Sequence, residues 1–232
     1  MGKNKKERCI HRHTIDEHPN CFAQGLTEVS SGPKSWYQEA GTKIGYLDIE
    51  TDNLKADFGT TLSWCIKDKD GEIHQSVVTK EELFNGETDR RLIQELVDKM
   101  KEYKIIITYY GTGFDLPWIR SKALHYNIDF PGFIVEINEK EKVIVKPSLY
   151  HWDLYYVVKS KLNLSRKSLD NACDYLGIEG KTPIDKDIWR KAKYGDKQAL
   201  GEVLMHNRGD VIILEFLHNR LTAFSKWNKT PL

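Results

Sequence analysis

The segment 45–51 constrains the fold most, because it has the apolar content of a buried strand and still contains two acids. Its residues alternate, so that Asp48 and Glu50 fall on one face of a strand and Leu47 and Ile49 on the other. Two carboxylates buried together are unfavourable unless a cation neutralises them. The segment therefore predicts a strand end that binds a divalent metal ion, and the alternative is a solvated strand edge.

The residues that follow predict a mixed α/β sheet that begins in the order β-β-β-α-β. A second and a third strand, joined by a turn, extend the first into an antiparallel meander. A capping pattern and then a run of apolar residues at helical spacing predict helix. A β-branched apolar run, typical of a buried parallel strand, comes next. These segments are, in order, residues 59–67, 72–78, 79–82, 89–103 and 104–110.

The second half of the chain predicts an inserted hairpin, one further strand and several helices. The hairpin covers residues 131–147, and the strand near residues 147–153 runs into a helix at 154–161. A helix at 169–177 ends at a glycine, and a last helical region spans 196–227. The expected inward residues are Leu116, Ile119 and Leu124 after the fourth strand, Leu169, Ala172, Cys173 and Leu176 in the helix at 169–177, and Val203, Met205, Val211, Leu214 and Leu217 in the last helix.

Three further acidic residues and one histidine stand where they could join the first two carboxylates. Asp115 follows the fourth strand at the start of a helix, where it is either a crevice-facing acid or a plain N-cap. Asp153 lies at a similar junction and is expected to be a structural cap. His206 and Asp210 are four residues apart and so share one face of the last helix, as a metal-facing pair or as a surface pair.

The N-terminal segment has a separate cluster of metal-binding residue types. Cys9, His11, His18 and Cys21 are the expected ligands of a zinc ion, with His13 as the alternative to His11. The other interpretation is a polar leader with solvated histidines. We expect a basic tail and zinc knuckle at residues 1–21, a linker at 22–43 and one domain at 44–232.

Composition excludes several classes of protein. Four cysteines in 232 residues are too few for a disulfide scaffold, and no stretch is apolar enough for a membrane span. We therefore expect a cytoplasmic protein without a membrane partner. The formal net charge is +1, so any contact with nucleic acid must come from a local patch.

Two motifs give the chain a family resemblance. Phe114-Asp115-Leu116-Pro117 matches F-D-x-P, and residues 206–211 match H-N-x-x-D-V. With D-x-E before them, they resemble the DEDD superfamily of 3′–5′ exonucleases, which has a ribonuclease H-like fold. The similarity is to the bacterial and viral ribonuclease H-like group related to the proofreading domain of B-family DNA polymerases, and it spans residues 43–220. The proofreading branch has Tyr at the position of His206, and the other common branch spaces its His one residue farther from the Asp.

The resemblance implies a function as well as a fold. Asp48, Glu50, Asp115 and Asp210 would bind two Mg²⁺ or Mn²⁺ ions, and His206 would orient or deprotonate the attacking water. The implied activity is 3′–5′ exonuclease cleavage of single-stranded DNA or RNA, in repair or replication. Two alternatives stay open: a structure-selective endonuclease with the same metal centre, and a nucleic-acid-binding module in which the zinc leader and aromatic residues act without catalysis.

Overall fold

The computed structural model describes residues 42–222, apart from 70, 87, 138–142 and 181–183, together with residues 230–231. Contacts divide the chain after Thr42, and the fold described below is that of the unit Lys43–Leu232. The predicted zinc ligands Cys9, His11, His13, His18 and Cys21 and nearly all of the expected linker lie outside the described residues.

A six-stranded mixed sheet forms the centre of this unit, in the order β3-β2-β1-β4-β7-β8. β1 to β3 pair antiparallel, as the predicted meander requires, β4 and β7 add in parallel, and β8 pairs antiparallel with β7. The order of elements up to β4 confirms the predicted α/β beginning. The strands are β1 Ile44–Thr51, β2 Thr61–Asp68, β3 Ile73–Val77, β4 Ile105–Thr108, β7 Tyr150–Asp153 and β8 Thr230–Pro231.

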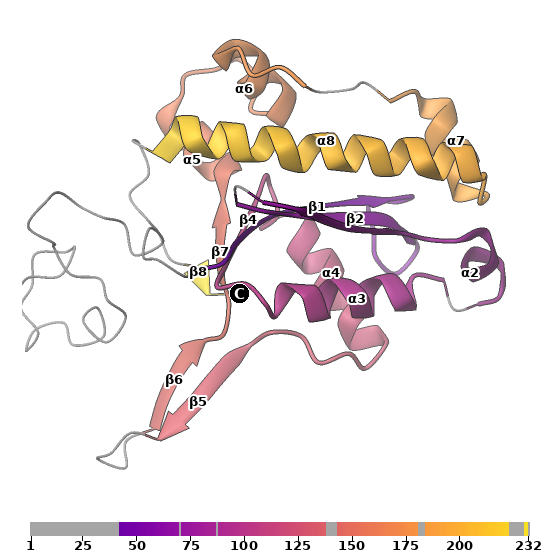
Figure 1. Ribbon diagram of the computed structural model, residues 1–232, viewed down its shortest axis with the longest axis horizontal. Helices are drawn as coiled ribbons and strands as arrows, with labels where there is room; N and C mark the ends of the chain where they lie inside the picture. The colour runs from indigo at the N-terminus through magenta and orange to yellow at the C-terminus, as the bar shows by residue number, and fades with distance from the viewer. Residues whose placement is uncertain are drawn as a thin grey trace, which may run out of the picture. The chain divides into compact units, whose positions relative to one another are not determined.

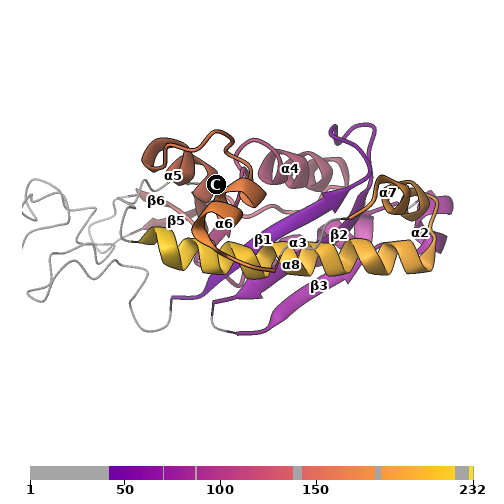
Figure 2. The same cartoon turned by 90° about the horizontal axis from the view of Figure 1, so that it is seen from above.

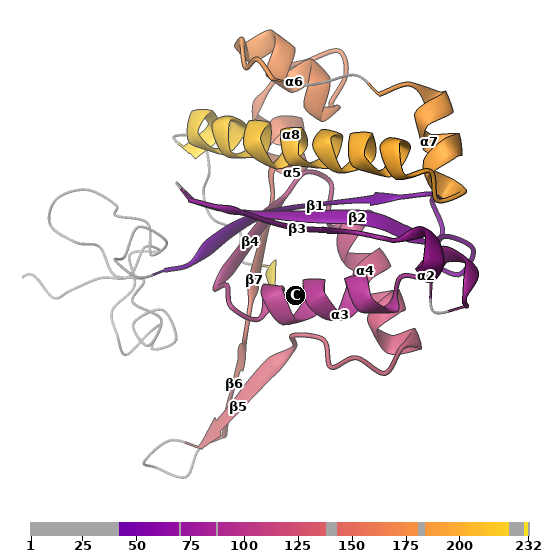
Figure 3. The same ribbon diagram turned by 45° about the vertical axis from the view of Figure 1, so that its right-hand side comes forward.

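Helices cover both faces of the sheet (Figures 1 and 3). α3 and α4 lie against one face, and the long helix α8 lies against the other, where it crosses β1, β2 and β3 (Figure 2). The helices are α2 Lys80–Phe84, α3 Arg90–Met100, α4 Asp115–His125, α5 Leu154–Lys161, α6 Leu169–Leu176, α7 Lys186–Lys193 and α8 Lys197–Leu221. None of the described helices is both long and apolar enough to cross a membrane.

The strand pleat sorts the side chains of β1 between the two helical layers. Leu47 and Ile49 join the main core, in which Leu92, Leu96 and Met100 of α3 are completely buried. A buried side chain of this size contributes about 1.5–3 kcal/mol relative to an exposed one. The alternate positions of β1 face α8, and this is where the two acids of the segment lie.

Most predicted boundaries agree with the capping groups of the structure. Thr79 and Glu82 form the predicted capping box at α2, and Asp196 is the N-cap of α8. α6 ends at Gly177, whose φ of 66° lies in the left-handed region that glycine adopts without strain. The predicted hairpin is present as β5 Phe133–Ile137 paired antiparallel with β6 Val143–Pro147, in a sheet of their own.

Two residues expected inside are exposed, and one helix was not predicted. Leu124 and Met205 are 73% and 64% exposed. Met205 lies two residues, about 200° of helix, from buried Val203, so it points away from the core; Leu124 lies beside buried Ala123 at the edge of the packed face. Helix α7 has no counterpart among the expected elements. The last helix ends at Leu221, and the expected end at Trp227 lies outside the described residues.

Candidate active site

The two acids of β1 project toward α8. The Nδ2 atom of Asn207 on α8 donates a hydrogen bond of 2.6 Å to Oδ2 of Asp48. Two residues farther along the strand, Oε1 of Glu50 lies 3.7 Å from Nε2 of His206, one helical position before Asn207. The alternation read from the sequence thus places both carboxylates on the face that α8 covers.

Asp115 contacts the backbone of the same strand. β1 pairs with β4 only as far as Tyr46, so the N–H of Ile49 lies beyond the last paired residue. Oδ1 of Asp115 accepts a hydrogen bond of 3.3 Å from this N–H, between the two acidic residues. The N-cap position of α4 belongs to Phe114. The interpretation of Asp115 as a plain N-cap is therefore wrong.

A tight loop after β4 sets the position of Asp115. Tyr110 adopts a left-handed φ of 65°, and its carbonyl accepts hydrogen bonds from the N–H groups of Gly113 and Phe114. A Cβ atom on Gly111 would stand 2.2 Å from Oγ1 of Thr108, so this position requires glycine. The loop turns directly from the strand into the first residue of α4.

Asp153 is a structural cap, as expected from the sequence. Its Oδ1 atom accepts hydrogen bonds from the N–H groups of Tyr155, at the start of α5, and Tyr110. Its Oδ2 atom accepts one from Thr112. The carboxylate therefore fixes the end of β7 to the loop that carries Asp115.

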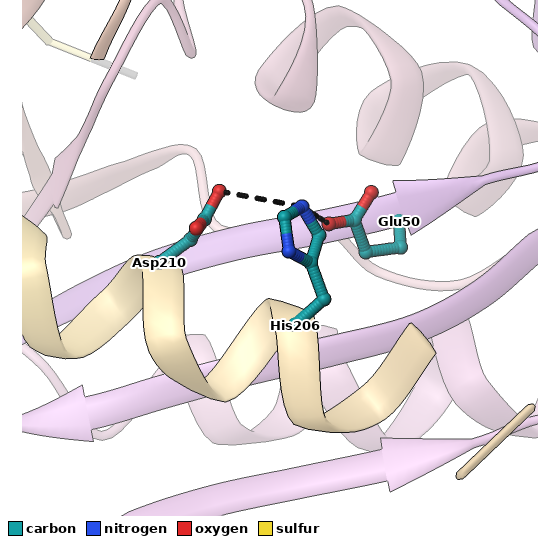
Figure 4. Close-up of side chains that lie close together, drawn as sticks. All are labelled: Glu50, His206 and Asp210. Atoms are coloured by element: carbon teal, nitrogen blue, oxygen red, sulfur yellow. Dashed lines mark ion pairs between the residues drawn. The ribbon is translucent and has the colours of Figure 1, made fainter. Parts of the chain in front are cut away.

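His206 and Asp210 complete the cluster on α8 (Figure 4). The Nε2 atom of His206 lies 4.0 Å from Oδ2 of Asp210, and the ring stands between that carboxylate and Glu50. One ligand atom from each of these three residues falls within 4.8 Å of the other two. The two carboxylates of this group are close enough to share one cation, with the imidazole beside it.

The electrostatics of the cluster favour a bound cation. Burial raises the pKa of Asp48 well above its ordinary value, and the carboxylates of Glu50, Asp115 and Asp210 raise it further, although Asn207 opposes the shift. Burial also raises the pKa of Asp115 to about 7, against the effect of its backbone hydrogen bonds. The folded chain thus makes ionised acids unfavourable at this point, and a divalent ion would reverse that.

The structure brings together all five residues that the sequence singled out. Glu50, Asp115 and Asp210 all lie close enough to Asp48 to raise its pKa, and His206 lies beside Glu50 and Asp210. Sequence reasoning gave no role to Asn207, which is completely buried and also accepts a hydrogen bond from Ser63. The only local signal was its place in the motif H-N-x-x-D.

Cys65, which pairs with Asp48 across β1 and β2, is not a candidate nucleophile. Burial raises the pKa of its thiol, and the charge of Asp48 adds to the shift. The thiolate is the reactive form of cysteine, so a raised pKa suppresses reactivity. The buried thiol of Cys173, expected in the core, is likewise packed inside.

Comparison with known proteins finds DNA polymerases similar to this chain. The chain is 32% identical to a DNA polymerase of Methanocaldococcus jannaschii over 111 residues, which are 44% of this chain and 7% of that protein. It is 29% identical to a DNA polymerase of Archaeoglobus fulgidus over 157 residues, 62% of this chain and 19% of the polymerase. The chain thus spans a fifth or less of the curated relatives that it matches.

A solved structure shows the same fold. The family B DNA polymerase of the hyperthermophilic archaeon Pyrobaculum calidifontis matches 85% of this chain with 26% of its own, at a TM-score of 0.63 and 21% sequence identity. The sequence matches confirm the predicted relationship to DNA polymerases, and the structural match shows that a family B polymerase shares the fold. The family model described as RNase H superfamily matches residues 45–222, from β1 to the end of α8. The chain therefore belongs to the RNase H superfamily.

Proposed function

We propose that this protein is a metal-dependent nuclease, a 3′–5′ exonuclease that hydrolyses single-stranded DNA or RNA with two divalent ions. The observation that supports it most is the convergence of four carboxylates and one imidazole from β1, α4 and α8 on one point. Similarity to DNA polymerases gives the substrate class, because those relatives act on nucleic acid.

The donor set fits Mg²⁺ or Mn²⁺. Asp48, Glu50, Asp115 and Asp210 offer hard oxygen atoms, and the raised pKa values of Asp48 and Asp115 mark a place where negative charge is in excess. When bound, such ions activate water and neutralise the charge that develops on the phosphate during phosphodiester hydrolysis.

The residues of the chain would then share the remaining tasks. Asn207 holds Asp48 in one orientation through its 2.6 Å hydrogen bond. The loop from Tyr110 to Phe114 and the cap at Asp153 hold Asp115. Nε2 of His206 lies within 4.0 Å of both Glu50 and Asp210, so a water held between these two carboxylates would lie beside an imidazole nitrogen that can take its proton.

The deciding experiment follows cleavage of end-labelled strands. The purified full chain with Mn²⁺ is incubated with single-stranded and double-stranded DNA and RNA, labelled at the 5′ or the 3′ end. We expect 5′-labelled single strands to shorten as a ladder and 3′-labelled strands to release a labelled mononucleotide at once. Discrete internal fragments from both labels would instead indicate the endonuclease.

Two variants on one helix make the assignment of the site specific. Asp210→Asn should lose activity by ~10²-fold or more, because it removes a ligand of the reacting centre. Glu202→Gln removes an exposed carboxylate of the same helix, and we expect it to retain activity. Equal activity of the two variants would contradict the proposed site.

A further inference from the structure

A surface pocket of about 350 Å³ lies between the start of α2 and the end of α7. It is lined by Lys80, Arg190, Lys191, Tyr194 and Asp196. The single acid among them already caps α8, since the N–H of Ala199 donates a 2.8 Å hydrogen bond to its Oδ1 atom. The remaining charge of the pocket is positive.

The two walls of this pocket are held together by backbone packing. Gly195, in the turn between α7 and α8, has a φ of 75°, and a Cβ atom there would stand 2.7 Å from Cγ and 3.0 Å from Cα of Lys80. The turn therefore packs directly against the start of α2. Figures 1, 2 and 3 all show α2 and α7 at the same end of the sheet.

Helix α7 also borders the candidate active site. The ring of Trp189 stands edge-on to that of His206, with 6.3 Å between their centroids. Nζ of Lys193 lies 3.5 Å from Oδ2 of Asp52, two residues beyond Glu50. Helix α7 thus lines the basic pocket and also contacts residues in and next to the acidic cluster.

The cations of this surface are available to a ligand. Helix α7 contains four basic residues and one acid, while its Ile188, Trp189 and Ala192 pack on the core. Among the described residues, Lys80 and Lys191 form no ion pair. Arg190 has only an exposed 3.3 Å contact with Asp187, a kind of pair that adds little stability.

Tyr194 adds an aromatic face to the same surface. Its side chain is 65% exposed, at the edge of the pocket. Exposed aromatic rings beside cations are the usual platform for unpaired bases, because each base offers a π-face for stacking. A duplex keeps its bases stacked inside, so this combination favours a single strand.

We propose that the surface formed by Lys80, Arg190, Lys191 and Tyr194 binds a single-stranded polynucleotide and leads it to the acidic cluster. This rests on the proposed nuclease function and deepens it. A strand of negative charge needs cations beside the site, because the four carboxylates repel it. Phosphates of the strand pair with the three basic side chains, and one base stacks on Tyr194.

Binding of a fluorescently labelled single-stranded oligonucleotide, measured by anisotropy in EDTA at several salt concentrations, tests the phosphate contacts. The variant Arg190→Gln/Lys191→Gln should bind about tenfold more weakly, and the slope of log affinity against log salt should fall by ~1.4, since each phosphate contact contributes ~0.7 with single strands. Lys99→Gln/Lys101→Gln removes two charges at the C-terminal end of α3, on the opposite face of the sheet (Figure 1), and serves as the matched control. Equal slopes for these two variants would overturn the proposal.

Tyr194 tests the choice of a single strand. Tyr194→Ala should weaken single-strand binding by at least ~5-fold, whereas Tyr194→Phe should bind like the original protein, because stacking needs the ring and not the hydroxyl. The same loss with a blunt duplex, or in both variants, would overturn the assignment to an unpaired base. Thermal unfolding of each variant shows that the fold is retained.

The outcome separates this proposal from the proposed function. If the protein cleaves strands but the α7 variants bind like the α3 control, the binding surface is wrong and the nuclease stands. If the α7 variants lose binding but no strand is cleaved with Mn²⁺, the surface stands and the nuclease is wrong.

Discussion

Asn207 connects the part of the candidate site on α8 with the part on β1. It is completely buried between β1, β2 and α8, and it donates to Asp48 while accepting from Ser63. A hydrogen bond to an ionised carboxylate is among the stronger ones in proteins, and here it also fixes the direction of the carboxylate lone pairs. A residue that hydrogen-bonds a metal-binding carboxylate in this way influences how tightly the carboxylate binds the metal.

We therefore predict that Asn207→Ala lowers both the Mn²⁺ affinity and the cleavage rate by ~10–100-fold. Ser63→Ala is the control, because it removes only the 3.2 Å hydrogen bond to Asn207 and leaves the one to Asp48. Metal titration and single-turnover rates, corrected for the folded fraction, measure the effect. If both variants bind Mn²⁺ equally well, Asn207 does not orient Asp48.

At the scale of elements, local patterns in the sequence identified most helices and strands. Alternation in β1 placed Asp48 and Glu50 on one face, and the capping box at Thr79 and Glu82 marked the start of α2. Such signals act within a few residues, where the backbone itself enforces the spacing. The pairing of Asp48 with Glu50 could be predicted for the same reason, whereas the grouping of Asp115 and Asp210 with them was implied by the resemblance to DEDD exonucleases.

The features that were missed depend on contacts between distant segments. The hydrogen bond between Asn207 and Asp48 joins residues 159 positions apart. Helix α7 is only eight residues long, so the helical spacing of Ile188, Trp189 and Ala192 extends over about one turn, and the helix is positioned by the core and by Asp52. Met205 is apolar, as core residues are, but it lies on the side of α8 that faces away from the core.

Helix α8 is also attached to the sheet through a buried histidine, which gives a testable dependence on pH. Nδ1 of His218 lies 2.7 Å from the hydroxyl oxygen of Tyr46, and its ring stands edge-on to Trp152. Burial lowers the pKa of His218 to about 3 from an ordinary 6.5. The folded state therefore keeps the ring neutral at pH values where the unfolded chain takes up a proton.

A lowered folded-state pKa of this kind stabilises the fold fully above pH 6.5, and the stabilisation is lost as the pH falls from there toward 3. We predict that His218→Gln reduces the slope of unfolding free energy against pH in this window by up to ~1.4 kcal/mol per pH unit, the value for one proton. His125→Gln, at an exposed position at the end of α4, should leave the slope unchanged. Urea unfolding at a series of pH values measures both, and equal slopes would contradict the role of His218.

At the scale of the whole molecule, a buried polar cluster joins the sheet to both helices of one layer. Asp89, completely buried before α3, accepts hydrogen bonds from the N–H of Thr61 in β2 and from the hydroxyl of Tyr126 after α4. Nζ of Lys122 on α4 lies 3.2 Å from its Oδ2 atom. The carboxylate of Asp89, at the start of α3, thus links α3 to β2 and α4.

Removing this carboxylate should be costly, because it leaves the Lys122 cation without its counter-ion and the N–H of Thr61 without its acceptor. We predict that Asp89→Ala lowers the free energy of unfolding by ~3–5 kcal/mol, the usual cost of breaking a buried ion pair. Asp98→Ala removes an exposed partner of Lys101 and should cost less than ~1 kcal/mol. Chemical denaturation of the two variants compares them, and a loss of similar size in both would show that the buried cluster contributes little.

The acidic cluster should make the stability of the entire fold depend on metal. Burial and neighbouring carboxylates raise the pKa of Asp48, and burial raises that of Asp115 from 3.8 to about 7. Between these two values the folded state retains a proton that the unfolded state has released. The folded state therefore binds more protons, and the free energy of unfolding must fall as the pH rises through this window.

We predict that in EDTA the protein loses stability between pH 4 and pH 7, and that saturating Mn²⁺ abolishes or reverses this loss, because the cation stabilises the ionised acids of the folded state only. Asp115→Asn should be more stable than the original protein in EDTA at pH 7 and gain less from Mn²⁺, although we expect it to lose activity. Glu202→Gln should follow the original protein under both conditions, because its carboxylate is exposed on α8. Thermal unfolding across this pH range, with and without metal, measures the difference, and a metal-independent profile would mean that these carboxylates do not form a cation site.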